Sequence, residues 1–177
     1  MMFKLFAAAW LAVLWLAAPP AMAQQPAFDL VVRAPDSVRE LLETHLEVRR
    51  YREVTDLDDA ELARLVVLAD KDARELLGTR GFFAPDLRIT REPGPPRPQL
   101  IVTVDPGVQA RVTGVEINFE GDIATSEDPD AIAQRRTIEA NWGLPVGQGF
   151  TQGGWDSSKA GATRTLLAKR YPAGRIS

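Results

Sequence analysis

The sequence predicts an α+β fold of tandem β-α-α-β-β modules, each a three-stranded sheet with two helices on one face, the second module being truncated. Three observations predict this fold. Apolar residues recur at helical spacing from position 62 to position 77, which is typical of a long amphipathic helix. Two strand patterns follow this helix, at 86–91 and at 99–104. The same order of elements then starts again after the turn at 105–107, and such recurrence indicates a repeated module.

The first 23 residues have the features of a signal peptide. Lys4 provides a positive charge, residues 5–18 form an uncharged apolar run, and Ala21-Met22-Ala23 has the small-x-small pattern that signal peptidase cleaves. The apolar run is 14 residues long, whereas a membrane-crossing helix needs ~20. We therefore expect cleavage after Ala23 and export of the mature chain. An uncleaved anchor is the alternative, and a mature N-terminus at Gln24 would exclude it.

Composition narrows the classes of function. The formal net charge is −3 and there is no cysteine. Loss of residues 1–23 removes one basic residue, Lys4, and no acidic one, so the charge falls to −4. This balance argues against nucleic acid or an anionic membrane surface as a partner. Without cysteine, disulfides, lipoprotein processing and thiolate zinc sites are excluded, and we expect no cofactor and no metal.

The first module is predicted to open with a short strand at 28–32 and a short helix. Ser37 and Glu40 have the spacing of a capping box, so Ser37 is the expected N-cap. The apolar face of this helix includes His45, the only histidine, and the helix ends near Leu46. A metal site or catalytic triad needs convergent partners for a histidine, so we predict a partly buried structural role for His45.

The second helix is the best-marked element. Thr55 and Asp58 have capping-box spacing at its start, and Gly78 or Gly81 can provide the left-handed residue at its end. Asp58, Asp59 and Glu61 form an acidic group in its first turn, where negative charge suits the helix dipole. We therefore interpret these carboxylates as structural rather than as a catalytic pair.

Two strands complete the first module. Apolar and polar residues alternate in 86–91, as in a half-buried strand, whereas 99–104 is apolar nearly throughout and fits a central strand. The proline-rich residues 92–98 are predicted to be a loop. The turn that follows marks a predicted boundary between a first domain, residues 24–106, and a second, residues 107–177.

The second module is predicted to contain a strand at 112–119, a short helix at 130–141, a longer helix at 151–169 and the start of a strand at 173–177. Helical spacing predicts that the inner face of the longer helix consists of Trp155, Ala162, Leu166 and Leu167. The closing hairpin of the first module has no counterpart here. Because one strand with two helices makes no stable sheet, we expect an incomplete second domain with more sequence after Ser177.

No sequence pattern indicates catalysis. Residues 147–153 are glycine-rich, but their G-x-G-x-x-x-G spacing differs from the dinucleotide fingerprint and no apolar strand runs directly into them. A turn with Thr151 as the N-cap of the following helix accounts for them. The sequence therefore predicts a binding protein rather than an enzyme.

Several motifs resemble a known family. The Gly81-Phe82-Phe83 run after the second helix is similar to that of POTRA domains, the periplasmic repeats of outer-membrane assembly factors. The stretch 141–150 (NWGLPVGQGF), together with 155–159 (WDSSK) and 166–172 (LLAKRYP), resembles the second POTRA repeat of the TamA family, which is related to BamA. The resemblance covers almost the whole mature chain. It concerns only the N-terminal POTRA region of that family.

The resemblance implies a periplasmic region, at the inner face of the outer membrane, that serves outer-membrane protein and autotransporter assembly. It implies unfolded outer-membrane client polypeptides as partners, a TamB-like inner-membrane protein as another, and membrane association only through a C-terminal barrel that this sequence lacks. Binding is expected by strand addition to a sheet edge. The candidate edge strand comprises Leu87, Arg88, Ile89, Thr90 and Arg91.

Two other interpretations stay open. The edge is blunted if Arg88, Arg91 and the prolines that follow keep other strands away; the protein would then be a scaffold that docks one fixed partner without binding clients. In the second interpretation, the chain is a non-functional gene fragment.

Overall fold

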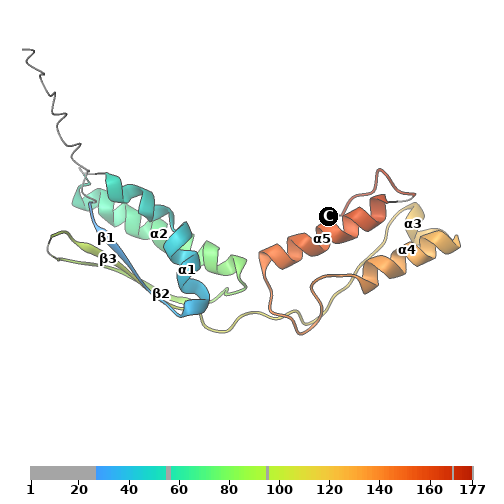
Figure 1. The fold of residues 1–177 in the computed structure, drawn as a ribbon, viewed down its shortest axis with the longest axis horizontal. Helices are drawn as coiled ribbons and strands as arrows, with labels where there is room; N and C mark the ends of the chain where they lie inside the picture. Colours follow the sequence, from blue (N-terminus) through green and yellow to red (C-terminus); the bar gives the residue numbers. More distant parts are fainter. Residues whose placement is uncertain (1–26, 55–56, 95, 169, 177) are drawn as a thin grey trace, which may run out of the picture.

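The computed structural model describes residues 27–54, 57–94, 96–168 and 170–176. The predicted signal peptide, Thr55 and Ser177 lie outside these residues. In chain order, as drawn in Figure 1, the elements are β1 (Asp29–Arg33), α1 (Asp36–His45), the 3-10 helix η1 (Glu47–Glu53), α2 (Asp59–Thr79), β2 (Asp86–Glu92), β3 (Gln99–Asp105), α3 (Asp122–Thr125), α4 (Pro129–Ala140) and α5 (Gln152–Leu167). None of the helices in the described part of the chain is long and apolar enough to cross a membrane.

The three strands form one sheet in the order β1-β3-β2. β1 runs parallel to β3, with Val31 opposite Ile101, and β2 runs antiparallel to β3, with Arg88 opposite Thr103. Helices α1 and α2 lie on one face of the sheet (Figure 1). This confirms the predicted α+β class and the central position of the 99–104 strand. Residues 27–105 are called the first unit below.

Helix α2 begins at Asp59, just after its predicted start, and its N-cap is Asp58 rather than the predicted Thr55. The Asp58 carboxylate accepts a hydrogen bond from the Glu61 amide at 2.7 Å, and the Glu61 carboxylate accepts one from the Asp58 amide at 3.2 Å. Asp58 is therefore the N-cap, with Glu61 as its capping-box partner. The helix stops before Gly81, whose φ of 83° is readily adopted by glycine.

The start and end of α1 differ from the prediction. The N-cap is Pro35 rather than Ser37, because the Pro35 carbonyl already accepts hydrogen bonds from the Val38 and Arg39 amides, which places Ser37 within the first turn. His45 is exposed instead of partly buried. The helix ends at this residue, and Leu46, which is 2% exposed, occupies the core position beyond it.

The core of the first unit lies between the sheet and its helices. Leu42 of α1, Leu77 of α2 and Leu100 of β3 are each no more than 1% exposed and belong to one cluster. Ile101 points to the opposite face of the sheet and is also 1% exposed. Burial on both faces explains why the sequence of β3 is apolar nearly throughout.

The second unit, residues 111–176, is built mainly from α4 and α5, which confirm the helices predicted at 130–141 and 151–169 to within two residues. The Thr151 hydroxyl caps α5 by accepting a hydrogen bond from the Gly154 amide at 3.0 Å. Ala162 and Leu166 are buried in a second cluster, as predicted. Trp155 and Leu167 are each 40% exposed, so their predicted burial is wrong.

The strand predicted at 112–119 does not form. Among the described residues, the only pairing in this region is an isolated bridge between Arg111 and Gly149. Residues 173–176 are not a strand either. The alternation of Val115, Ile117 and Phe119 is that of a strand, but a strand is defined by hydrogen bonds to a neighbour, and no strand among residues 27–54, 57–94, 96–168 and 170–176 pairs with this segment.

Candidate polypeptide-binding edge

β2 is an edge strand of the sheet. Within the described residues its only strand neighbour is β3, to which every residue from Asp86 to Glu92 is aligned. The backbone N–H and C=O groups that point away from β3 have no ladder partner, and such a row is a template for another extended chain. The candidate residues, Leu87 to Arg91, are the middle of this strand.

The side chains of β2 alternate between the two faces of the sheet. Leu87 is buried and Ile89 half-buried, and both pack against the core beneath the helices. Arg88 and Thr90 are exposed on the opposite face. The edge is therefore held in place by its apolar face, while its outer margin and its polar face are accessible.

Arg91 is directed toward α2 rather than along the open margin. Its guanidinium lies 2.5 Å from the Asp59 carboxylate, at the first residue of α2. Because the Asp59 side chain is 88% exposed, this pair contributes ~0–1 kcal/mol. Arg88 makes no ion pair with the part of the chain that the structure describes. Of the two arginines expected to blunt the edge, one is thus engaged elsewhere.

Arg74, a residue of α2, attaches the start of β2 to that helix. Arg74 donates to the Asp70 carboxylate at 2.8 Å and to the carbonyl of Pro85, directly before β2, at 3.0 Å. The hydrogen bond to Asp70 raises the pKa of Arg74 above its ordinary value, so the guanidinium stays charged. Sequence reasoning missed this role, although the i, i+4 spacing of Asp70 and Arg74 is a recognisable sign of a helix ion pair.

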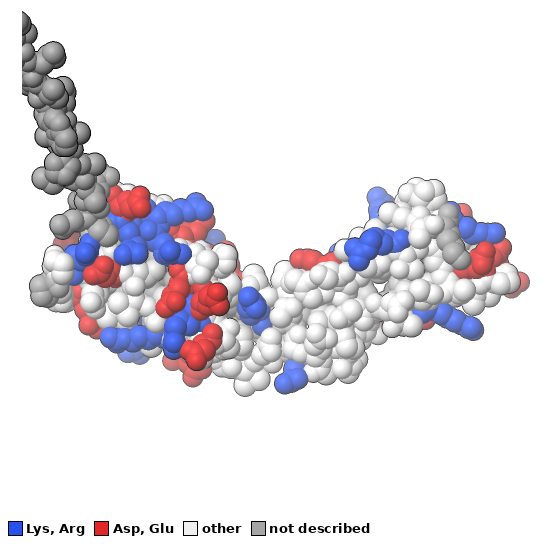
Figure 2. Space-filling view, viewed as in Figure 1, with Lys and Arg blue, Asp and Glu red and all other residues white. Residues whose placement is uncertain are grey.

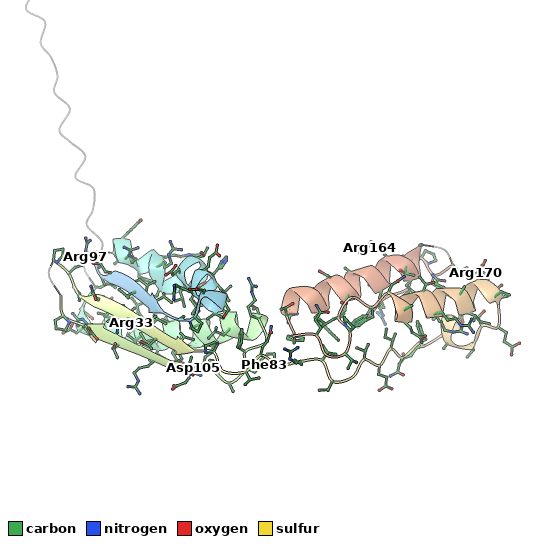
Figure 3. All side chains as sticks on the ribbon, turned by 60° about the horizontal axis from the view of Figure 1, so that its bottom comes forward. Arg33, Phe83, Arg97, Asp105, Arg164 and Arg170 are labelled. Atoms are coloured by element: carbon green, nitrogen blue, oxygen red, sulfur yellow. The ribbon has the colours of Figure 1, made fainter. Side chains whose placement is uncertain are left out.

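The opposite edge, β1, is shorter and more obstructed. It has five residues against seven in β2. At its start, the Asp29 carboxylate lies 3.3 Å from Arg97 and 3.8 Å from Arg52. Arg97 lies at the end of the first unit that is remote from the second unit (Figure 3). Of the two edges, β2 therefore offers the longer open margin.

The 141–150 motif lies between α4 and α5, and its backbone pairs with residues 110–112, where the second unit begins. The Val112 amide donates to the Gln148 carbonyl, and the Gly147 amide donates to the Val112 carbonyl. Leu144 is 2% exposed. The glycine-rich residues thus form a structural turn, in agreement with the interpretation made from their spacing.

The chain resembles a solved structure of known proteins. No protein-family model matches the chain, and no curated protein matches it. Among solved structures, it is similar to the crystal structure of Haemophilus influenzae BamA POTRA3-5, with 17% sequence identity and a TM-score of 0.35. The match covers 81% of this chain and 51% of that chain. The chain therefore spans about half the length of that structure.

Proposed function

We propose that this chain is the periplasmic POTRA region of an outer-membrane protein and autotransporter assembly factor of the TamA type. It binds extended client or partner polypeptides by adding a strand to β2. The observation that carries the proposal is the open margin of β2 from Asp86 to Glu92, with β3 on one side and no strand on the other within the described residues. The β-α-α-β-β order and the motifs in 141–172 support it.

The chemistry of such binding is that of the backbone. A client strand exchanges N–H···O=C bonds with β2, and each bond contributes ~0.5–1.5 kcal/mol net. Apolar client residues at alternate positions lie beside Leu87 and Ile89, whereas polar ones lie beside Arg88 and Thr90. Because the main chain provides most of the affinity, many sequences with this alternation can bind. Such binding suits transient holding of unfolded outer-membrane strands.

The proposal extends to the surroundings of the protein. Residues 1–23 direct export, and the region acts in the periplasm at the inner face of the outer membrane. Its partners include client polypeptides and a TamB-like inner-membrane protein. The resemblance of 141–172 to the TamA family supports these statements.

Disulfide trapping tests the edge directly, since the chain has no cysteine of its own. The full chain with Thr90→Cys is mixed with an unfolded strand peptide that alternates apolar and polar residues and carries one cysteine. Neighbouring strands lie ~4.8 Å apart, within the ~4.4–6.8 Å between Cα atoms that a disulfide spans. We expect rapid trapping, with yields that alternate as the peptide cysteine is moved one residue at a time.

Two matched variants serve as controls. Arg33→Cys places an exposed thiol on the β1 edge, and Val108→Cys places one at a position that is 92% exposed and outside the sheet. Trapping at Thr90→Cys should exceed both. Equal rates at all three positions, or no dependence on the peptide position, would show that β2 is not the binding edge.

A fixed scaffold is the second candidate, and the junction between the units favours it. Gln109 Nε2 lies 2.8 Å from the Arg80 carbonyl and 3.2 Å from the Phe150 carbonyl, so the units are joined by specific contacts. Recovery from envelope extracts of one stoichiometric partner, with no unfolded clients, would support this alternative.

A further inference from the structure

The polar face of β2 has a charge pattern that is complementary to itself. Arg88, Thr90 and Glu92 occupy alternate positions of the strand, so their side chains lie on the same face of the sheet, away from the helices, and all three are exposed. Neither Arg88 nor Glu92 makes an ion pair with the described part of the chain. The row is therefore positive, neutral and negative in order along an edge of the sheet.

A second copy of β2, running antiparallel with Thr90 opposite Thr90, matches this row at every position. Residues that are directly opposite in an antiparallel pair lie on the same face. In this register, Arg88 of each copy lies opposite Glu92 of the other, and opposite charges in this position favour pairing. The two three-stranded sheets would then form one continuous sheet, with the helices of both copies on the same side.

The charges select this register over its neighbours. If the pairing is centred on Ile89, Asp86 of each copy lies opposite Glu92 of the other. If it is centred on Arg88 or on Arg91, two arginines face each other. Like charges that are directly opposite destabilise a strand pair. Only the register centred on Thr90 places opposite charges across from each other at both ends of the row.

The other face of β2 accommodates the same pairing. In the register centred on Thr90, Ile89 lies opposite Arg91 of the second copy. Ile89 is half-buried, and the aliphatic part of an arginine side chain covers apolar surface while its charged end stays in water. The Arg91 guanidinium already has Asp59 as its partner, 2.5 Å away. No charge on this face is therefore left opposite a like charge.

The remaining charges near the row are acidic and lie at its far end. Asp86, two residues before Arg88, is ~7 Å further along the strand, and in this register it lies opposite the uncharged Gly94 of the second copy. Asp105 is aligned with Asp86 on β3, on the inner side of the strand. On the face seen in Figure 2, positive and negative side chains are interspersed over the first unit, so no field of one sign covers that face.

We propose that β2 pairs with β2 of a second copy of this chain, in the antiparallel register centred on Thr90, and that this self-pairing closes the edge to other strands. The inference rests on the same open margin as the proposed function, but it specifies a partner and a register of its own. Because one margin pairs with one strand at a time, a client and a second copy compete for β2.

Disulfide formation between two copies measures the register. The full chain with Thr90→Cys is oxidised in the absence of any peptide. In the proposed register the two Cα atoms of residue 90 lie ~4.5–5.5 Å apart, within the ~4.4–6.8 Å that a disulfide spans. Arg33→Cys on the β1 edge and Val108→Cys outside the sheet are the matched controls. We expect Thr90→Cys to form linked dimers about tenfold faster than either control.

Charge reversal tests the pairing without a cysteine. Arg88→Glu and Glu92→Arg each place like charges opposite each other in a homodimer, and each should weaken association by about tenfold in analytical ultracentrifugation. An equimolar mixture of the two variants restores opposite charges at both positions and should associate as the parent chain does. Recovery on mixing also shows that both variants are folded. Arg33→Glu, an exposed position on the β1 edge, should leave association unchanged.

The outcomes separate self-pairing from client binding. A parent chain that stays monomeric up to about 1 mM, or charge variants whose association does not recover on mixing, overturns self-pairing. Trapping of a strand peptide at Thr90→Cys, by a chain that does not link to itself, also overturns it and leaves the proposed function intact. Dimers linked through Thr90→Cys that an excess of unfolded strand peptide does not reduce support self-pairing and count against client binding at β2.

Discussion

The rings of Phe83 and Phe150 contact each other between the end of α2 and the start of α5, with centroids 5.7 Å apart and planes inclined by 43°. Phe83 lies at the end of the first unit nearest to the second (Figure 3). Gln109 lies in the same junction and bonds to the carbonyls of Arg80 and Phe150. An aromatic contact and a side-chain bridge therefore join the two units.

Phe83→Ala should loosen the junction without unfolding the first unit. The side chain is 64% exposed, and an aromatic pair contributes ~0.5–1.5 kcal/mol, so the loss of stability should be small. Electron-spin distances between labels at Val67→Cys and Arg136→Cys, both exposed positions on separate units, should become more broadly distributed. Val108→Ala, at a 92% exposed site, should leave them unchanged. A distribution as narrow as that of the parent chain would mean that Phe83 does not hold the junction.

Gly81→Ala should destabilise the protein by ~1–3 kcal/mol. Gly81 has a φ of 83°, and a Cβ there would approach the Phe150 carbonyl oxygen, a backbone atom that cannot move aside easily. Gly114→Ala is the matched control, because nothing lies within 4 Å of a Cβ at that position. Urea unfolding of the two variants measures the difference. Equal stabilities would contradict the strain argument.

Local signals predicted the first unit well. The apolar stripe of helix α2 predicted its length and its buried face, whereas the capping box was predicted one turn too early, at Thr55 and Asp58 instead of Asp58 and Glu61. The apolar run of β3 predicted a central strand, which the structure confirms: Val102 is buried beneath the helices and Ile101 is buried on the opposite face between the neighbouring strands. The central position of 99–104, together with the family resemblance, predicts that residues 87–91 form a binding edge, and their role in binding stays a prediction.

Features that depend on distant partners were not predicted. Residues 112–119 have the side-chain alternation of a strand, yet pairing requires a neighbour that the pattern cannot specify. His45 matched an apolar face by spacing, but the helix ends there and Leu46 takes the core position. The contact between Arg74 and the Pro85 carbonyl joins residues eleven positions apart, and no periodicity indicates it.

Gln134→Leu should lower the stability of the second unit by ~1–3 kcal/mol. The Gln134 side chain is 5% exposed and donates to the carbonyls of Thr165 and Leu166 at 2.7 and 2.9 Å. Leucine has a similar size but leaves both carbonyls at the end of α5 without this donor. Gln152→Leu removes only an exposed bond to Asp156 and should cost less than ~0.5 kcal/mol. Hydrogen exchange of α5 amides reports on the second unit alone, and equal protection in both variants would contradict the prediction.

Arg74→Ala should destabilise the first unit more than Arg91→Ala, although each arginine contacts one carboxylate. Arg74 also donates to the Pro85 carbonyl at 3.0 Å and so connects α2 to the start of β2, whereas Arg91 contacts only an exposed Asp59. We expect a loss of ~1 kcal/mol for Arg74→Ala, since its side chain is partly exposed, and less than that for Arg91→Ala.

The pH dependence of this difference follows from the raised pKa of Arg74. A group whose pKa is raised on folding contributes stability below its unfolded-state pKa and loses that contribution only as the pH rises through the folded-state value. Arginine keeps its charge throughout the range in which the protein can be handled. The difference between the two variants should therefore be the same at about pH 6 and at about pH 9 in urea unfolding. Loss of the difference at the higher pH would show that the Arg74 guanidinium is not the group that holds β2 to α2.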